Sequence, residues 1–257
     1  MATLREITHY LDALLSTHEI PDYPNALNGL QVDSDRDTTK VAAAVDVSER
    51  TIRGALDEGA SLLLVHHGLF WGGLQPLRGS FLRRVRLLLE SELALYASHL
   101  PLDAHGEIGN NVLLARKLSL TPTAGFARFQ SLDVGVMGDA ELPTAELVSR
   151  AEAFAKRHGG SVRTAGVTPG RLTSRWAICT GAGADAGTLR EAVDKGVDTL
   201  VVGEGPHWTA VDAGERGLAI IYAGHYATET LGVRAIAERV SDAFGIPWVF
   251  IPAPTGF

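Results

Sequence analysis

Two adjacent imidazoles, His66 and His67, stand at the end of a short apolar run that covers residues 62 to 65. Consecutive apolar residues between Gly59 and Gly68 indicate a strand that is buried on both faces. Open α/β sheets place their ligand sites at the carboxyl ends of such strands. Neutral imidazole is a common metal ligand, but two histidines cannot hold a metal alone. Taken by itself, the pair is equally well explained as ordinary polar residues at a strand end.

Further potential ligands follow other predicted strands. Asp103 comes after a strand expected over residues 93 to 97, and His225 and Glu229 lie four residues apart where a helix begins. Residues with that spacing share one face of a helix. Together with the histidine pair, these residues are too many for one tetrahedral zinc ion, but they suit two divalent ions that share a bridging carboxylate.

Five more polar residues near predicted strand ends have open roles. Asp46 follows a buried strand, and it is either a site residue or a partner for the amino terminus of the next helix. His99 and His105 flank Asp103, and each either binds a metal or orients a ligand that does. Glu204 and His207 follow a later strand and are candidate pocket residues, with structural roles equally open.

Composition narrows the chemistry. The chain has 257 residues, a formal net charge of -7 and a single cysteine, Cys179. An internal disulfide and a thiolate-rich zinc site are therefore excluded, and a metal centre has to use nitrogen and oxygen ligands, which admit zinc, iron, manganese, nickel or cobalt. The acidic balance, without any block rich in Lys and Arg, argues against nucleic acid as a partner. No apolar run is long enough to cross a membrane and no signal peptide is evident, so we expect a cytoplasmic protein.

The elements that position these residues are those of an α/β protein. Thr3 and Glu6 form a capping-box pattern that opens an amphipathic helix. A strand, a helix and the strand before His66 then form a βαβ unit. Alternating helices and strands continue to the end of the chain, with a glycine-rich stretch at 181 to 187 that we interpret as a tight turn between a strand and a helix. Strands are predicted at residues 41–45, 62–65, 93–97, 132–137, 161–166, 175–180, 199–202, 218–224 and 248–251, and helices at 4–15, 48–58, 80–90, 110–118, 144–158, 189–195 and 225–244.

A change to Thr, Pro and Gly near residues 119 to 126 indicates a domain boundary. We therefore predict two α/β domains with mixed, mainly parallel sheets and a dinuclear metal site at strand carboxyl ends between them. The metal-site domain is expected to contain residues 1–122 and 226–257, and the second domain residues 123–225.

Three separated motifs, in order along the chain, resemble the signatures of the GTP cyclohydrolase 1 type 2 homologue family, also called Nif-three-like proteins. The motifs are His66-His67-Gly68-Leu69-Phe70-Trp71, then His99-Leu100-Pro101-Leu102-Asp103-Ala104-His105 with Gly109-Asn110-Asn111, and Gly224-His225-Tyr226-Ala227-Thr228-Glu229. The resemblance covers nearly the whole chain, although the chain lacks the inserted domain of longer family members. It implies that His66, His67, Asp103, His225 and Glu229 bind two divalent metal ions, and that the chain assembles into a toroidal homohexamer.

Two functions are compatible with this pattern. The first is a dinuclear metal-dependent hydrolase that acts on a nucleotide or related small molecule, with Glu204 or His207 as the proton shuttle. The family name implies opening of the guanine ring of GTP. The second is a non-catalytic, metal-binding toroidal scaffold or regulatory adaptor. Further polar and aromatic residues expected near the centre favour the enzyme, because a purely structural metal site would be closed and dry.

Overall fold

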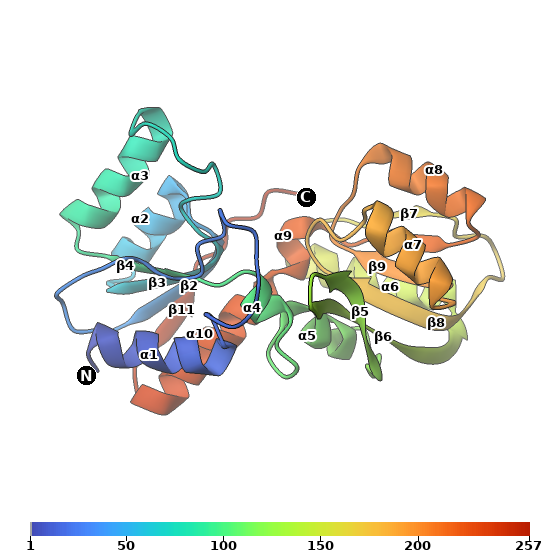
Figure 1. Ribbon diagram of the computed structural model, residues 1–257, viewed down its shortest axis with the longest axis horizontal. Coiled ribbons are helices and arrows are strands. Elements are labelled where there is room, and N and C mark those ends of the chain that lie inside the picture. The colour runs from blue at the N-terminus through green and yellow to red at the C-terminus, as the bar shows by residue number, and fades with distance from the viewer. Residues whose placement is uncertain (1) are drawn as a thin grey trace. The chain divides into compact units, whose positions relative to one another are not determined.

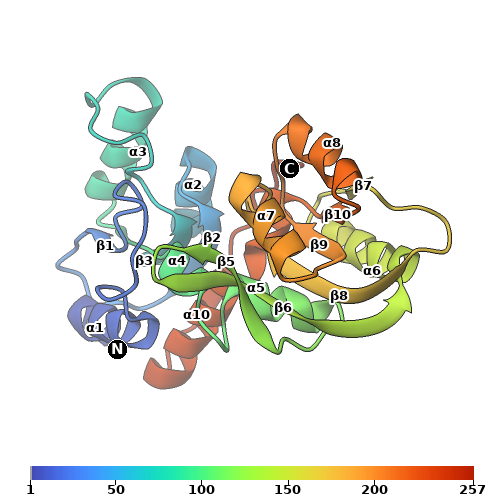
Figure 2. The same cartoon turned by 45° about the vertical axis from the view of Figure 1, so that its right-hand side comes forward.

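Two α/β units make up the chain in the computed structural model, which describes residues 2–257. Unit 1 contains the residues up to Leu102 together with Gly232–Ala253. Unit 2 contains Asp103–Leu231 and Pro254–Phe257. In Figures 1 and 2 the elements of unit 1 run from blue to cyan and resume in red, whereas those of unit 2 run from green to orange.

Unit 1 is built on a sheet of five strands in the order β1-β4-β3-β2-β11. Strand β1 is antiparallel to β4, and the other neighbours are parallel. The central strands are apolar and fully buried along most of their length, as expected for parallel strands with both faces covered. The strands are β1 (Gly29–Val32), β2 (Val41–Asp46), β3 (Leu62–His67), β4 (Ala94–Ala97) and β11 (Trp248–Phe250).

Helices cover this sheet on both sides. Helices α2 (Glu49–Asp57) and α3 (Gly79–Glu90) pack on one face, where Ile52 and Leu88 join the core formed by β2, β3 and β4. Helices α1 (Leu4–Leu15) and α10 (Thr230–Phe244) lie on the other face (Figure 1). The predicted capping box of α1 is confirmed, because the Thr3 side chain accepts a hydrogen bond from Glu6 N–H while the Glu6 carboxylate accepts one from Thr3 N–H. A short helix, α4 (Leu100–Asp103), follows β4.

Unit 2 contains a mixed sheet of six strands in the order β5-β6-β8-β9-β10-β7. Strands β8, β9 and β10 are parallel, so their carboxyl ends meet at one edge, and the remaining pairings are antiparallel. The strands are β5 (Ala124–Phe129), β6 (Leu132–Pro143), β7 (Arg163–Ala165), β8 (Leu172–Cys179), β9 (Thr199–Val202) and β10 (Ala219–Tyr222).

The alternation of side chains along β8 divides the interior of unit 2 into two cores. Trp176 and Ile178 belong to the core beneath α5 (Asn110–Lys117), α6 (Thr144–Arg157) and α9 (His225–Thr228). Ala177 and Cys179 belong to the opposite core, which α7 (Ala186–Asp194) and α8 (His207–Glu215) cover. Among residues 2–257, no helix is both long enough and apolar enough to cross a membrane.

The division into units differs from the expected domains. The first boundary falls between Leu102 and Asp103 rather than near residue 122, because α5 packs against β6 and β8 of unit 2. The second falls at 231/232 rather than at 225/226, so α9 also belongs to unit 2. Four elements, β1, α4, β5 and α8, were not predicted from the sequence, and β6 extends six residues beyond the predicted end, to Pro143.

Candidate metal centre

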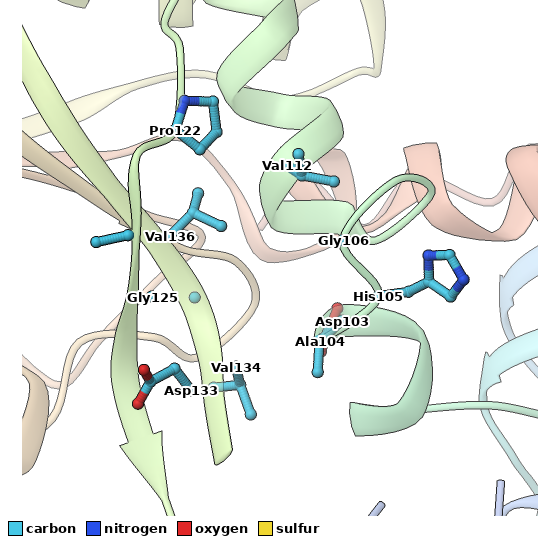
Figure 3. A pocket seen from close by; sticks show the side chains of 12 residues that line it. Asp103, Ala104, His105, Gly106, Val112, Pro122, Gly125, Asp133, Val134 and Val136 are labelled. Carbon is cyan, nitrogen blue, oxygen red and sulfur yellow. The ribbon is translucent and has the colours of Figure 1, made fainter. Parts of the chain in front are cut away.

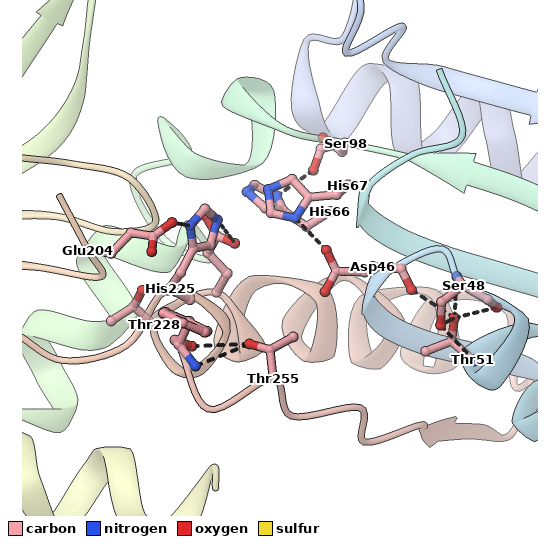
Figure 4. Close-up of polar contacts among 12 residues, drawn as sticks. Asp46, Ser48, Thr51, His66, His67, Ser98, Glu204, His225, Thr228 and Thr255 are labelled. Carbon is pink, nitrogen blue, oxygen red and sulfur yellow. Dashed lines mark hydrogen bonds and ion pairs between the residues drawn. The ribbon is translucent and has the colours of Figure 1, made fainter. Parts of the chain in front are cut away.

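In unit 1, the register between two parallel strands sets the position of the histidine pair. Asp46 at the end of β2 is directly paired with His67 at the end of β3. The Nδ1–H of His67 donates to the Asp46 carboxylate over 2.9 Å (Figure 4). Helix α2 is capped by Ser48, so Asp46 is not the cap of that helix, and its carboxylate contacts His67 instead. In the neutral imidazole, this bond places the proton of His67 on Nδ1 and the lone pair on Nε2.

His66 is held in the same manner by the backbone. Its Nδ1–H donates to the carbonyl oxygen of Ser98 over 2.8 Å, in the segment that follows β4 (Figure 4). A carbonyl oxygen can only accept, so Nδ1 must carry a proton, and in the neutral imidazole Nε2 then has the lone pair. The ring is completely buried.

His99, also in the segment after β4, lies beside these two rings. Its ring centroid is 4.9 Å from that of His66 and 5.7 Å from that of His67. Trp71 meets the His99 ring edge-on at 4.7 Å. The Nδ1–H of His99 donates to the carboxylate of Asp22 over 2.9 Å.

The turn after His67 requires a glycine. The amide of Gln31 lies where a side chain on Gly68 would have to go. The same amide oxygen accepts a hydrogen bond from Leu69 N–H over 2.7 Å, and the amide nitrogen donates to the carbonyl of Leu27. The Gln31 side chain therefore fixes the turn that follows the two imidazoles and precedes the aromatic residues.

In unit 2, the candidate ligands lie at the carboxyl ends of β8, β9 and β10. The backbone is tightly packed there, since Glu204 N–H donates to Gly181 and Gly224 N–H donates to Gly203. Gly181 has a φ of +61°, and a Cβ on it would collide with the carboxylate of Glu229. The glycine-rich stretch is thus a tight turn, as predicted, and its backbone fits closely around Glu229.

His225 and Glu229 are in direct contact, as their spacing predicted. His225 Nε2 lies 3.1 Å from Glu229 Oε2, and His225 Nδ1 bonds to Glu204 over 2.8 Å (Figure 4). Burial lowers the pKa of His225, but the hydrogen bonds and charges of Glu229 and Glu204 outweigh this and raise the pKa to about 9. The Glu229 side chain is almost completely buried. A cation would satisfy the negative charge concentrated at this point.

Asp103 is buried at the end of α4, and the Asn110-Asn111 motif holds it. Asn110 Nδ2 donates to the Asp103 carboxylate over 2.8 Å. Asn111 donates to the carbonyl of Val134 and accepts from Thr180 N–H, which joins α5 to β6 and to the end of β8. Asn110 thus holds the Asp103 carboxylate, and Asn111 anchors the same helix to the sheet of unit 2.

The remaining candidates lie in different surroundings. His207 begins α8 and is exposed. His105 Nδ1 accepts hydrogen bonds from the backbone N–H groups of Glu107 and Ile108. His105 and Asp103 both line a cavity of about 270 Å³ in unit 2, whose other walls come from α5, β5 and β6 and include Gly125, Val134 and Val136 (Figure 3).

The donor chemistry of both units fits a divalent metal ion. Each of the imidazoles His66, His67, His99 and His225 has Nδ1 bonded to an oxygen, the usual outer-shell arrangement of metal-binding histidines. The carboxylates Asp103 and Glu229 add buried oxygen ligands. The fold and these side chains define an α/β protein whose nitrogen and oxygen atoms could hold a metal ion.

Comparison with known proteins identifies the family. The family model described as Duf34/NIF3 (NGG1p interacting factor 3) matches residues 2–255. Proteins named GTP cyclohydrolase 1 type 2 homolog are similar over nearly their whole length. The one from Deinococcus radiodurans is 41% identical over 98% of this chain and 93% of its own, and the one from Escherichia coli K12 is 35% identical over 97% of each. This chain belongs to the Duf34/NIF3 family.

Solved structures agree with this assignment. The solved structure of the protein ybgI, described as being of unknown function, has a TM-score of 0.89 and 34% identity over 99% of this chain and 100% of its own. The crystal structure of a protein from Thermus thermophilus has a TM-score of 0.79 and 37% identity, covering 98% and 99% of the two chains. Reduced HcgD from Methanocaldococcus jannaschii, at 21% identity and a TM-score of 0.85 over 98% of each chain, shows the shared fold.

Proposed function

We propose that this protein is a dinuclear metal-dependent hydrolase, similar to GTP cyclohydrolase 1 type 2, that acts on a nucleotide or a related small molecule. Two divalent ions are proposed to bind His66, His67, Asp103, His225 and Glu229. The observation that carries the proposal is the contact of His225 with Glu229 and Glu204, because an imidazole between buried and half-buried carboxylates is a built site for a cation. The relatives' shared name supports the reaction class.

When bound, the ions would lower the pKa of water and offset negative charge that develops on the substrate. The chain's own residues position those ions. Glu204 holds His225 as Asp46 holds His67. We therefore propose a positioning role for Glu204 in place of a proton shuttle, and the exposed His207 has no assigned step. A cytoplasmic location stays a prediction from the sequence.

The cavity beside Asp103 is the proposed entrance for substrate. Its walls carry mostly small side chains and glycines, and its volume of about 270 Å³ lies just below the roughly 300–1,000 Å³ of typical ligand pockets. A heterocyclic base or another compact molecule fits this volume, whereas a polymer does not. Asp103 connects the cavity with the proposed ligand set.

The proposal is tested by turnover. Protein loaded with zinc, iron, manganese, nickel or cobalt is assayed for formate release from GTP, and then for products from other nucleotides. We expect metal-dependent turnover that Glu229→Gln reduces by more than the roughly 10- to 100-fold typical of losing an outer-shell partner. Glu238→Gln, which alters an exposed carboxylate on α10, is the matched control and should behave as the wild type.

A second variant tests the cavity. Gly106→Val adds bulk where no heavy atom lies within 4 Å of an added Cβ, so the fold should tolerate it. We expect weaker substrate binding and an unchanged metal content. Metal-loaded wild type without turnover on any nucleotide, above the Glu229→Gln background, would favour the non-catalytic scaffold.

A further inference from the structure

In unit 1, a third imidazole, that of His99, joins the pair His66 and His67. One ring nitrogen from each of His66, His67 and His99 lies within 4.8 Å of the other two. The group comes from neighbouring parallel strands, because His66 and His67 end β3 while His99 follows β4. The sheet register therefore brings the third ring to the other two.

His99 is held more elaborately than packing requires. Its Nδ1–H donates to Asp22 over 2.9 Å, and its backbone N–H donates to the side-chain oxygen of Asn28 over 2.7 Å. Asp22 in turn accepts hydrogen bonds from Asn28 Nδ2 and from Leu100 N–H, each over 2.8 Å. Both side chains are largely buried, at 14% exposed for His99 and 6% for Asp22. The loop that contains Asp22 and Asn28, far from His99 in the sequence, thus fixes the position of this imidazole.

The orientation of all three rings has the same chemical result. The Nδ1 atoms of His66, His67 and His99 donate to a carbonyl or to a carboxylate, so in the neutral form each ring carries its lone pair on Nε2. In this tautomer each ring has its only N–H bonded to another group, so the three rings cannot donate hydrogen bonds to one another. Several imidazole lone pairs that lie close together can bind one metal cation.

We propose that His99 is a further metal ligand, which gives unit 1 three imidazoles for one divalent ion, and that Asp22 is its positioning residue. The inference rests on the proposed metal centre and adds to its ligand set. Three imidazoles favour a transition metal such as zinc, cobalt, nickel or iron over magnesium or calcium, which prefer oxygen ligands. Trp71, edge-on to both His67 and His99, covers the group with apolar surface.

The test is metal binding by the whole protein, with cobalt as the probe. The visible absorption of bound Co²⁺ reports ligand number and type, chelator competition gives the affinity, and X-ray absorption counts imidazoles per ion. We expect His99→Ala to change the spectrum, to remove one imidazole and to weaken one ion by more than about 100-fold. Asp22→Asn should change the spectrum and weaken the same ion by about 10- to 100-fold.

The control is His18→Ala, which removes an imidazole whose side chain is 80% exposed, and it should leave both readouts unchanged. If His99→Ala fails to fold, the number of imidazoles bound in the wild type decides. Four imidazoles shared between two ions would support the inference, and three would contradict it. Wild-type protein that binds no cobalt would overturn the proposed function. Wild type that binds cobalt, with His99→Ala unchanged in spectrum and affinity, would overturn this inference alone.

Discussion

The carboxylate of Asp46 determines which nitrogen His67 presents. Asp46→Asn keeps the size of the side chain but removes the charge that orients the ring, so we expect metal affinity to fall by about 10- to 100-fold with little change in stability. Chelator competition with and without the substitution measures this. Asp57→Asn, at an exposed position at the end of α2, is the control. Equal affinity in Asp46→Asn and wild type would remove Asp46 from the site.

Cys179 provides a prediction about reactivity. Burial raises the pKa of its thiol, and the negative charges of Asp103, Asp185 and Glu229 raise it further. Because the thiolate is the reactive form, a raised pKa leaves less of it at pH 8. We expect a thiol reagent to modify native protein more than about tenfold more slowly than protein in guanidinium. Rapid modification of the native chain would show that the end of β8 is open to solvent.

At the residue scale, the sequence predicted the proposed ligands because each follows a strand end or falls on a helical spacing. It did not identify Asp22, which lies in an irregular loop 77 positions from His99. No periodicity marks such a residue. The Asn28-Gly29 pair is typical of a turn, and its sequence does not reveal that Asn28 bonds both Asp22 and His99.

Substitutions at two glycines in different turns can distinguish the effect of backbone strain from the effect of a change in site geometry. Gly181 and Gly59 both have positive φ values, of +61° and +71°, but an added Cβ meets Glu229 at Gly181 and nothing within 4 Å at Gly59. Alanine at Gly59 should lower the free energy of unfolding by about 1–2 kcal/mol through backbone strain alone, and alanine at Gly181 should lower it further because its Cβ collides with Glu229. We expect only Gly181→Ala to weaken metal binding as well. Denaturant unfolding and metal titration of both variants measure the two effects, and equal metal affinities would contradict the close fit around Glu229.

The elements that the sequence missed have weak local signals. Strand β5 contains Gly125 and a left-handed Ala127, so its composition resembled a linker. Helix α8 begins directly after Gly205-Pro206, a pair that is typical of turns. Long apolar strands such as β2 and β3 were predicted correctly because burial on both faces leaves an unbroken apolar run.

For the whole molecule, family membership leads us to propose a homohexamer. Light scattering should then give a mass of about 164 kDa, six times the 27.3 kDa of the chain. Exposed apolar side chains such as Trp208 and Val211, one turn apart on α8, are candidates for the contacts between subunits. A monomer at micromolar concentration would contradict this assembly.

The domain boundaries could not be derived from composition alone. The Thr, Pro and Gly residues near position 122 lead into β5 instead of linking two domains, and α5 before them packs on unit 2. Tertiary packing therefore decided where α5 belongs. Such packing is not visible in the hydrophobic pattern of a helix, which shows that one face is buried but not against which sheet.

The edge strand β11 has a consequence for synthesis on the ribosome. It pairs with β2 in the sheet of unit 1, but it follows all of the strands of unit 2 in the chain. Vectorial synthesis usually lets the amino-terminal domain fold first. Here the strands of unit 2 are all translated before the last strand of unit 1, so the edge of β2 in the nascent histidine-bearing sheet stays unpaired until β11 has been made.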